Sequence, residues 1–246
     1  MKLYEITNIS QSKSIDFDFI EHHCQQALTM LQERKISVWK GIYNSDIDCE
    51  LLTPHKRRSK NTSNYYTMLL SNLPNWKEYP RRDYSIICTT KPQYAQNYGH
   101  LYYVLPFDGA NFGICPNYDI FEVNLITDSR SIDMEEMNEV WKRCNFSEDN
   151  FQQFLEKFVN QYNGNLMEIR DYCFPLWKYI KNLPRPTSKI DALQFFMDLY
   201  DPKRLGFSYR NLPTEFEYNR EVWTDSPCYF INADNHKYEL TKRYGL

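Results

Sequence analysis

Three short stretches, far apart along the chain, carry side chains that together could bind a phosphorylated ligand and act on it. The first places Lys40 before Gly41, the second ends in the adjacent hydroxyls of Thr89 and Thr90, and the third contains Glu221. A cation on a strand can bind a phosphate group. A fixed carboxylate can stabilise the positive charge that develops on a sugar as its glycosidic bond breaks. The residue types therefore suggest a nucleotide-sized site, provided that the fold brings the three stretches together.

Apolar periodicity and turn residues predict the elements that would position these side chains. Strands are expected over 35–43, 83–90, 100–106, 111–115, 221–223 and 228–231. Helices are expected over 16–35, where Ser14 or Asp16 would be the cap, and over 64–72 and 92–98. Within 131–200, helices are expected over 134–144, from 147 onward, over 167–180 and over 188–200. Strands grouped before and after a helical block favour an α+β fold over alternating β-α-β units.

The composition predicts a folded protein with a large aromatic core. The chain has 246 residues, of which 20 are Tyr and 15 are Phe, so it has enough apolar area to offset its ordering entropy. We expect one domain over 1–246, with 131–200 as a helical insertion. The net charge of −3 provides no global attraction to nucleic acid.

Neither a membrane segment nor a metal site is expected. No stretch approaches the roughly 20 apolar residues that cross a bilayer, and the N-terminal residues lack the apolar core of a secretory signal. Seven widely spaced cysteines favour free thiols in a reducing compartment, and neither a CxxC nor an HxxxH pair is present. We therefore expect a cytoplasmic protein, in the host cytoplasm if it is viral, with no membrane partner.

In their order along the chain, the three stretches resemble the arginine–serine–glutamate class of ADP-ribosyltransferases. That family has an aromatic-Arg-Gly strand, a Ser-Thr-Ser strand with Ala shortly after it, and a Glu-x-Glu-Val strand followed by a Pro/Gly turn and an apolar strand. The corresponding residues here are Trp39-Lys40-Gly41, Cys88-Thr89-Thr90 with Ala95, and Asn219-Arg220-Glu221-Val222. Residues 81–119 also look like a part of uncharacterised phage-type proteins.

The resemblance implies an α+β fold of two small packed β-sheets, with an N-terminal helix and the helical insertion. It implies that NAD is the substrate, lying in a cleft between the sheets, and that ADP-ribose passes to a protein or nucleic-acid acceptor, as in toxin-like enzymes. Glu221 would stabilise the ribose cation, with Thr89 and Thr90 beside it. The residues expected to contact NAD are Lys40, Gly41, Cys88, Arg58 and Tyr98.

Three departures from the family pattern leave an inactive site as the alternative. Lys40 replaces the arginine and cannot form a bidentate fork with phosphate, which Arg57 or Arg58 would then supply. Asn219 replaces the first glutamate, which often activates the acceptor, and Cys88 replaces the first serine. The alternative function is therefore a binding or structural module with the same fold and no chemistry.

Other chemistry is also compatible with the sequence. Asp119 with Glu122 is a second candidate for the acid. The basic loop 55–60 beside Tyr65 and Tyr66 is a candidate backbone and stacking site for nucleic acid.

Ordinary structural roles compete with each functional one. Lys40 would be a solvated charge, the threonine pair would cap the helix that starts at Pro92, and Tyr98 and Trp223 would belong to the core.

Overall fold

The computed structural model divides the chain into two compact units. It describes residues 11–12, 14–33, 37–43, 47–58, 65–127, 130–143, 150–164 and 189–245, and the single residues 167, 170, 171 and 177. The first unit comprises residues 1–55, 84–114 and 209–246, and the second comprises 56–83 and 115–208. The predicted insertion 131–200 lies within the second unit.

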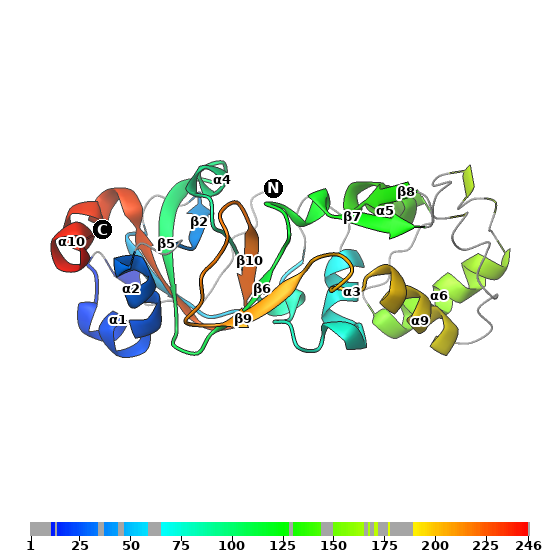
Figure 1. Cartoon of the computed structure of the whole chain (residues 1–246), viewed down its shortest axis with the longest axis horizontal. Helices are drawn as coiled ribbons and strands as arrows, with labels where there is room; N and C mark the ends of the chain where they lie inside the picture. The colour runs from blue at the N-terminus through cyan, green and yellow to red at the C-terminus, as the bar shows by residue number, and fades with distance from the viewer. Residues whose placement is uncertain are drawn as a thin grey trace. The chain divides into compact units, whose positions relative to one another are not determined.

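A nine-stranded sheet is the framework of the first unit, in the order β1-β3-β11-β5-β2-β4-β10-β6-β9 (Figure 1). The pairings from β1 to β6 along this order are antiparallel. The strands are β1 (Gln11–Ser12), β2 (Trp39–Ile42), β3 (Cys49–Leu52), β4 (Ile86–Thr89), β5 (His100–Pro106), β6 (Asn111–Ile114), β9 (Ser208–Asn211), β10 (Glu221–Thr224) and β11 (Cys228–Asn232).

The described helices of this unit are α1 (Phe17–His23), α2 (Gln25–Gln32), α4 (Pro92–Gln96) and α10 (Ala233–Tyr244). Asp16 caps α1, as predicted, by accepting a hydrogen bond from the backbone N–H of Phe19. The expected continuous helix over 16–35 is wrong, because Cys24 interrupts it between α1 and α2. Figure 1 shows α1, α2 and α10 gathered beside β5, where their apolar residues pack against one face of the sheet.

The sheet is weakest between β2 and β4. These strands share a single residue pair, Trp39 opposite Thr89. Yet one apolar cluster contains Val104 and Phe230 from one side of this junction and Phe112 and Val222 from the other. The main apolar core of the first unit therefore continues across this junction, along one face of the sheet.

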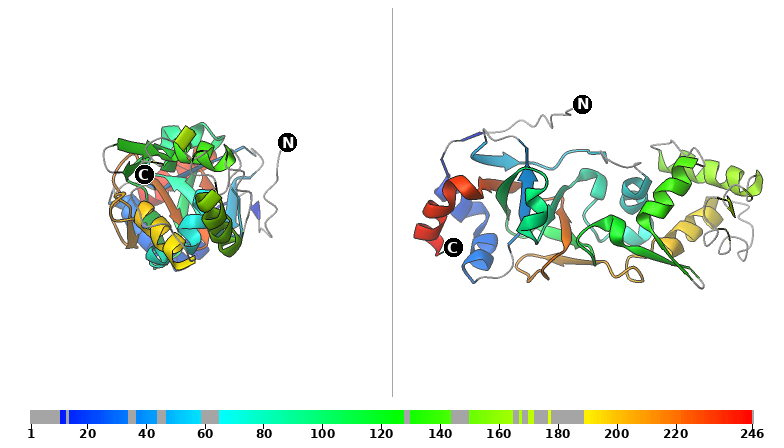
Figure 2. Two further views of the ribbon diagram at one scale, coloured as in Figure 1. Left: turned by 90° about the vertical axis from the view of Figure 1, so that its right-hand side faces the viewer. Right: turned by 90° about the horizontal axis from the view of Figure 1, so that it is seen from above.

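The second unit is mainly helical and has its own aromatic core. Its elements are α3 (Tyr65–Asn72), α5 (Met134–Arg143), α6 (Phe151–Gly164), α9 (Lys189–Leu199), the 3-10 turns η1 (Pro74–Trp76) and η3 (Ile120–Glu122), and a two-stranded sheet of β7 (Asn124–Thr127) and β8 (Arg130–Asp133). A further 3-10 turn, η2 (Arg82–Tyr84), lies where the chain passes between the units. Helices α6 and α9 lie side by side (Figure 2). Trp141, Phe154, Phe158 and Phe196 form the aromatic centre of this unit.

The α+β fold class is confirmed, whereas the two small packed sheets are not. Hydrogen bonding runs continuously through all nine strands of the first unit. Within the described residues, no helix has both the length and the apolar character needed to span a membrane. The predicted helix over 167–180 lies largely outside the described residues.

Candidate functional site

A row of three side chains brings the acid and one hydroxyl together. Glu221 of β10 lies directly opposite Thr89 of β4, and Thr89 lies opposite Trp39 of β2. Directly opposed residues project from the same face of an antiparallel sheet, so these three side chains are neighbours on one face. Glu221 is 9% exposed and Thr89 is 8% exposed. The indole of Trp39 packs on Tyr103, with ring centroids 4.2 Å apart.

The threonine hydroxyls hold the backbone that leads into β10. The Oγ1 of Thr89 donates to the carbonyl of Arg220 at 3.2 Å and accepts from the N–H of Lys91 at 3.1 Å. The Oγ1 of Thr90 donates to the carbonyl of Glu217 at 2.8 Å and accepts from the N–H of Arg220 at 2.9 Å. Thr90 is 1% exposed. Both hydroxyls thus position Glu221 through its preceding residues.

The segment held by Thr90 is a tight turn. Asn219 has φ +66°, in the left-handed region, which asparagine tolerates better than most residues other than glycine. The guanidinium of Arg220 donates to the Glu217 carboxylate, with Nε 2.9 Å from Oε2, and these hydrogen bonds lower the pKa of Glu217. A glutamate at position 219, as in the family pattern, would be strained in this conformation, so the turn itself accounts for the asparagine.

Helix α4 packs on the same face of the sheet, against Gly41. A Cβ added to Gly41 would overlap the carbonyl oxygen of Ala95 and would lie 2.9 Å from Cβ of Tyr98. Gly41 therefore serves close packing of α4, and Ala95 is buried there at 2% exposure. The side chain of Tyr98 is 53% exposed, so its predicted place in the core is wrong.

Lys40 and Cys88 project from the opposite face. Lys40 lies opposite Tyr102, and Cys88 lies opposite Val222. The Lys40 ammonium donates to the carbonyl of Ile87 at 3.1 Å, where β2 and β4 separate, and Cys88 is 4% exposed in the main core. Between Cys88 and Thr89 of β4, Thr89 is therefore the residue beside Glu221.

The remaining candidates lie in the second unit. Arg58 is exposed and belongs to that unit. Asp119 caps η3 by accepting from the N–H of Phe121, and Glu122 is exposed in the same turn.

Two further predictions concern side chains in the cores. Tyr65 and Tyr66 are each 8% exposed, so their rings are not available as a stacking platform. Trp223 is fully buried, as predicted, and its indole fills the space above Gly113.

The described cysteines lie in the interior of the protein. Cys24, Cys49, Cys88, Cys115 and Cys228 are free and buried, which agrees with the prediction of free thiols. Burial raises the pKa of Cys24 and of Cys49 to about 12, so neither is a nucleophile at neutral pH. No group of acids, histidines and cysteines that could hold a metal lies within the described residues.

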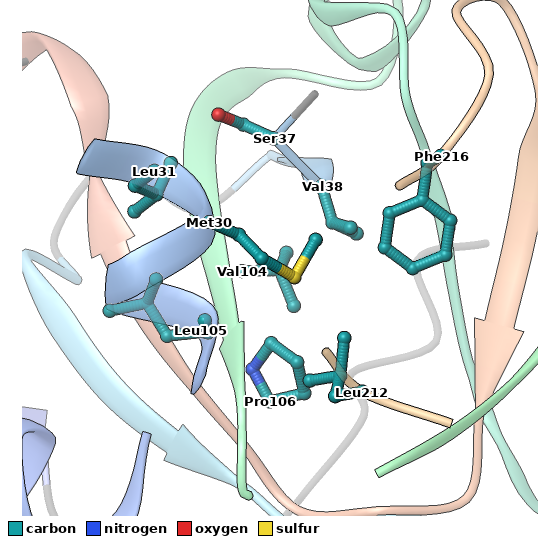
Figure 3. A pocket seen from close by; sticks show the side chains of 10 residues that line it. Met30, Leu31, Ser37, Val38, Val104, Leu105, Pro106, Leu212 and Phe216 are labelled. Atoms are coloured by element: carbon teal, nitrogen blue, oxygen red, sulfur yellow. The ribbon is translucent and has the colours of Figure 1, made fainter. Parts of the chain in front are cut away.

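A cavity in the first unit has none of the predicted site residues in its lining. Its volume is about 20 Å³, enough for roughly one water molecule. Met30 and Phe216 point toward each other across it, and Val38, Val104 and Leu212 are among the apolar residues that line it (Figure 3). It is too small and too apolar for a nucleotide.

Two site residues were given no role in the site from the sequence alone. Trp39 is in the row with Thr89 and Glu221, and Lys91 is bonded to Thr89. The alternation of the 35–43 strand puts Trp39 and Lys40 on opposite faces, but only the register shows which of these faces holds the acid.

No protein-family model matches the sequence, and no curated protein or solved structure is significantly similar to it. The residues of the site are therefore the basis for assigning a function.

Proposed function

We propose that the protein is an ADP-ribosyltransferase that uses NAD and acts through Glu221. The observation that carries this proposal is the row of Trp39, Thr89 and Glu221 on three adjacent strands. These residues come from the same three stretches that resemble the family, separated by about 50 and about 130 residues. Their alignment puts a buried carboxylate beside a hydroxyl, with an aromatic ring on the next strand, and this arrangement supports the proposed chemistry.

In the proposed step, the bond between C1′ of the ribose and the nicotinamide nitrogen breaks. The bonding electrons leave with nicotinamide, and the ribose takes on oxocarbenium character. The Glu221 carboxylate stabilises that positive charge, more strongly than it would in water because it is 9% exposed. A lone pair of the acceptor then attacks C1′, and the proton displaced from the acceptor passes to solvent.

Glu221→Gln tests this function because it removes the charge and keeps the shape. We expect NAD cleavage and transfer to fall by roughly a hundredfold or more, measured with labelled NAD and cell lysate as the source of acceptor. Glu215→Gln is the matched control, since Glu215 is an exposed acid in the segment before β10. Equal thermal unfolding temperatures for both variants would show that the fold is intact.

Wild-type protein that neither cleaves NAD nor transfers ADP-ribose would contradict the proposal. An unchanged rate for Glu221→Gln would likewise remove Glu221 from the chemistry.

The second candidate is a binding or structural module without chemistry. The position of Lys40 favours this candidate, because its ammonium is bonded to the Ile87 carbonyl and its side chain lies on the face opposite Glu221. Calorimetric titration with NAD separates the two candidates, because the module would bind NAD without turnover or would show no heat of binding.

A further inference from the structure

A transferase of this kind needs a cation for the phosphates of NAD, and Lys40 lies on the wrong face to supply it. Lys91 is a different candidate on the same segment as Thr89. Its backbone N–H donates to the Thr89 hydroxyl at 3.1 Å, and its backbone is extended, with φ −118° and ψ 109°. The N–H of Thr90 donates to Arg220 O at 2.9 Å, and the backbone bends at Thr90. Lys91 then lies at the start of α4, the helix that packs on the face of Thr89 and Glu221.

Aromatic rings hold the ammonium of Lys91. Its Nζ lies 4.7 Å from the ring centroid of Tyr94 and 6.0 Å from that of Tyr218. The Tyr218 hydroxyl donates to Oε1 of Gln93 at 3.1 Å, which fixes one ring relative to α4. These contacts restrict a flexible side chain without neutralising its charge.

The neighbouring cation, Arg220, is already neutralised by Glu217. Lys91, in contrast, forms no ion pair with any carboxylate of the described residues. Within the described part of the chain, no acid therefore compensates this positive charge, which lies beside the turn that leads into Glu221.

We infer that Lys91 binds the pyrophosphate of the nucleotide. The identity of the nucleotide rests on the proposed function, whereas the binding of a phosphate by Lys91 does not. An ammonium is a compact point charge, so it suits a pyrophosphate without requiring the bidentate geometry of arginine. Lys40 instead satisfies the carbonyl of Ile87 at the junction of β2 and β4.

Calorimetric titration of the full chain with ADP-ribose tests the inference, with adenosine as a probe that lacks phosphate. We expect Lys91→Gln to weaken ADP-ribose binding about tenfold or more and to leave adenosine binding unchanged. Lys91→Arg keeps the charge and should stay within a few-fold of wild type. Lys237→Gln, at an exposed lysine on α10, is the matched control and should bind as wild type does.

The inference is overturned if Lys91→Gln binds ADP-ribose as tightly as wild type, if Lys40→Gln causes the loss instead, or if wild type does not bind ADP-ribose. Lys91-dependent binding by a protein that cannot cleave NAD would remove the proposed function and keep this inference. If the protein cleaves NAD but its affinity for ADP-ribose does not depend on Lys91, the proposed function is kept and this inference is removed.

Discussion

At the scale of single residues, the site depends on hydroxyls that bind backbone. Thr90 is 1% exposed and makes its hydrogen bonds to Glu217 and Arg220 where water has no access. If the hydroxyl were removed, water could therefore not take its place. Leaving a buried donor or acceptor without a partner costs about 1–3 kcal/mol. The position of Glu221 is therefore coupled to a side chain that need not touch the substrate.

Thr90→Val should destabilise the protein by about 1–3 kcal/mol, because valine has the same shape and leaves the Arg220 N–H and the Glu217 carbonyl unpaired. Urea unfolding measures the change in the free energy of unfolding. Thr90→Ser keeps the hydroxyl and should recover most of the loss. Equal stability of wild type and Thr90→Val would show that the turn does not depend on this hydroxyl.

At the scale of elements, the contact between α4 and β2 sets how closely the helix approaches the sheet. Gly41 is required there because the helix backbone at Ala95 occupies the space of a Cβ. The backbone of α4 cannot move aside as the end of a flexible side chain can. A larger residue at position 41 would therefore force α4 to shift. This shift would carry Tyr94 and Lys91 with it.

Gly41→Ala should destabilise the protein by about 1–3 kcal/mol, since overpacking forces the backbone to move. Thermal unfolding measures the loss, and near-ultraviolet circular dichroism reports the altered tyrosine environment. Gln96→Ala, at an exposed position of α4, is the control and should change stability little. A Gly41→Ala protein as stable as wild type would mean that α4 adapts without cost.

At the scale of the whole molecule, the chain builds separate cores in its two units. The described apolar clusters around the sheet all belong to the first unit. Trp141 packs on Phe154, Phe158 and Phe196 within the second unit. Regions with distinct cores can open as distinct cooperative units.

Trp141→Ala should cost about 3–5 kcal/mol, because it opens a cavity among aromatic rings. Hydrogen exchange followed by mass spectrometry should show faster exchange in α5, α6 and α9, with protection kept in β4 and β10. If exchange became faster by a similar factor in these three helices and in the two strands, the two units would unfold as one.

The sequence alone determined the elements whose side chains repeat with a clear period. The spacing of apolar residues predicted β5, α3 and α9 close to their bounds, because burial on one face needs that period. It did not predict β3, which is short, nor α10, which is polar along most of its length and is defined by its caps at Asn232 and Gly245. Such elements form because neighbouring strands and helices cover them.

The sequence also determined that an acid, hydroxyls and a cation lie on strands, and the tertiary structure decided which of them share a face. A shift of one residue in strand register moves every side chain to the other face. The register of β10 on β4 puts Glu221 beside Thr89, and that of β2 on β5 turns Lys40 away from them. Pairing between strands far apart in sequence depends on the whole sheet, so no local pattern could have decided it.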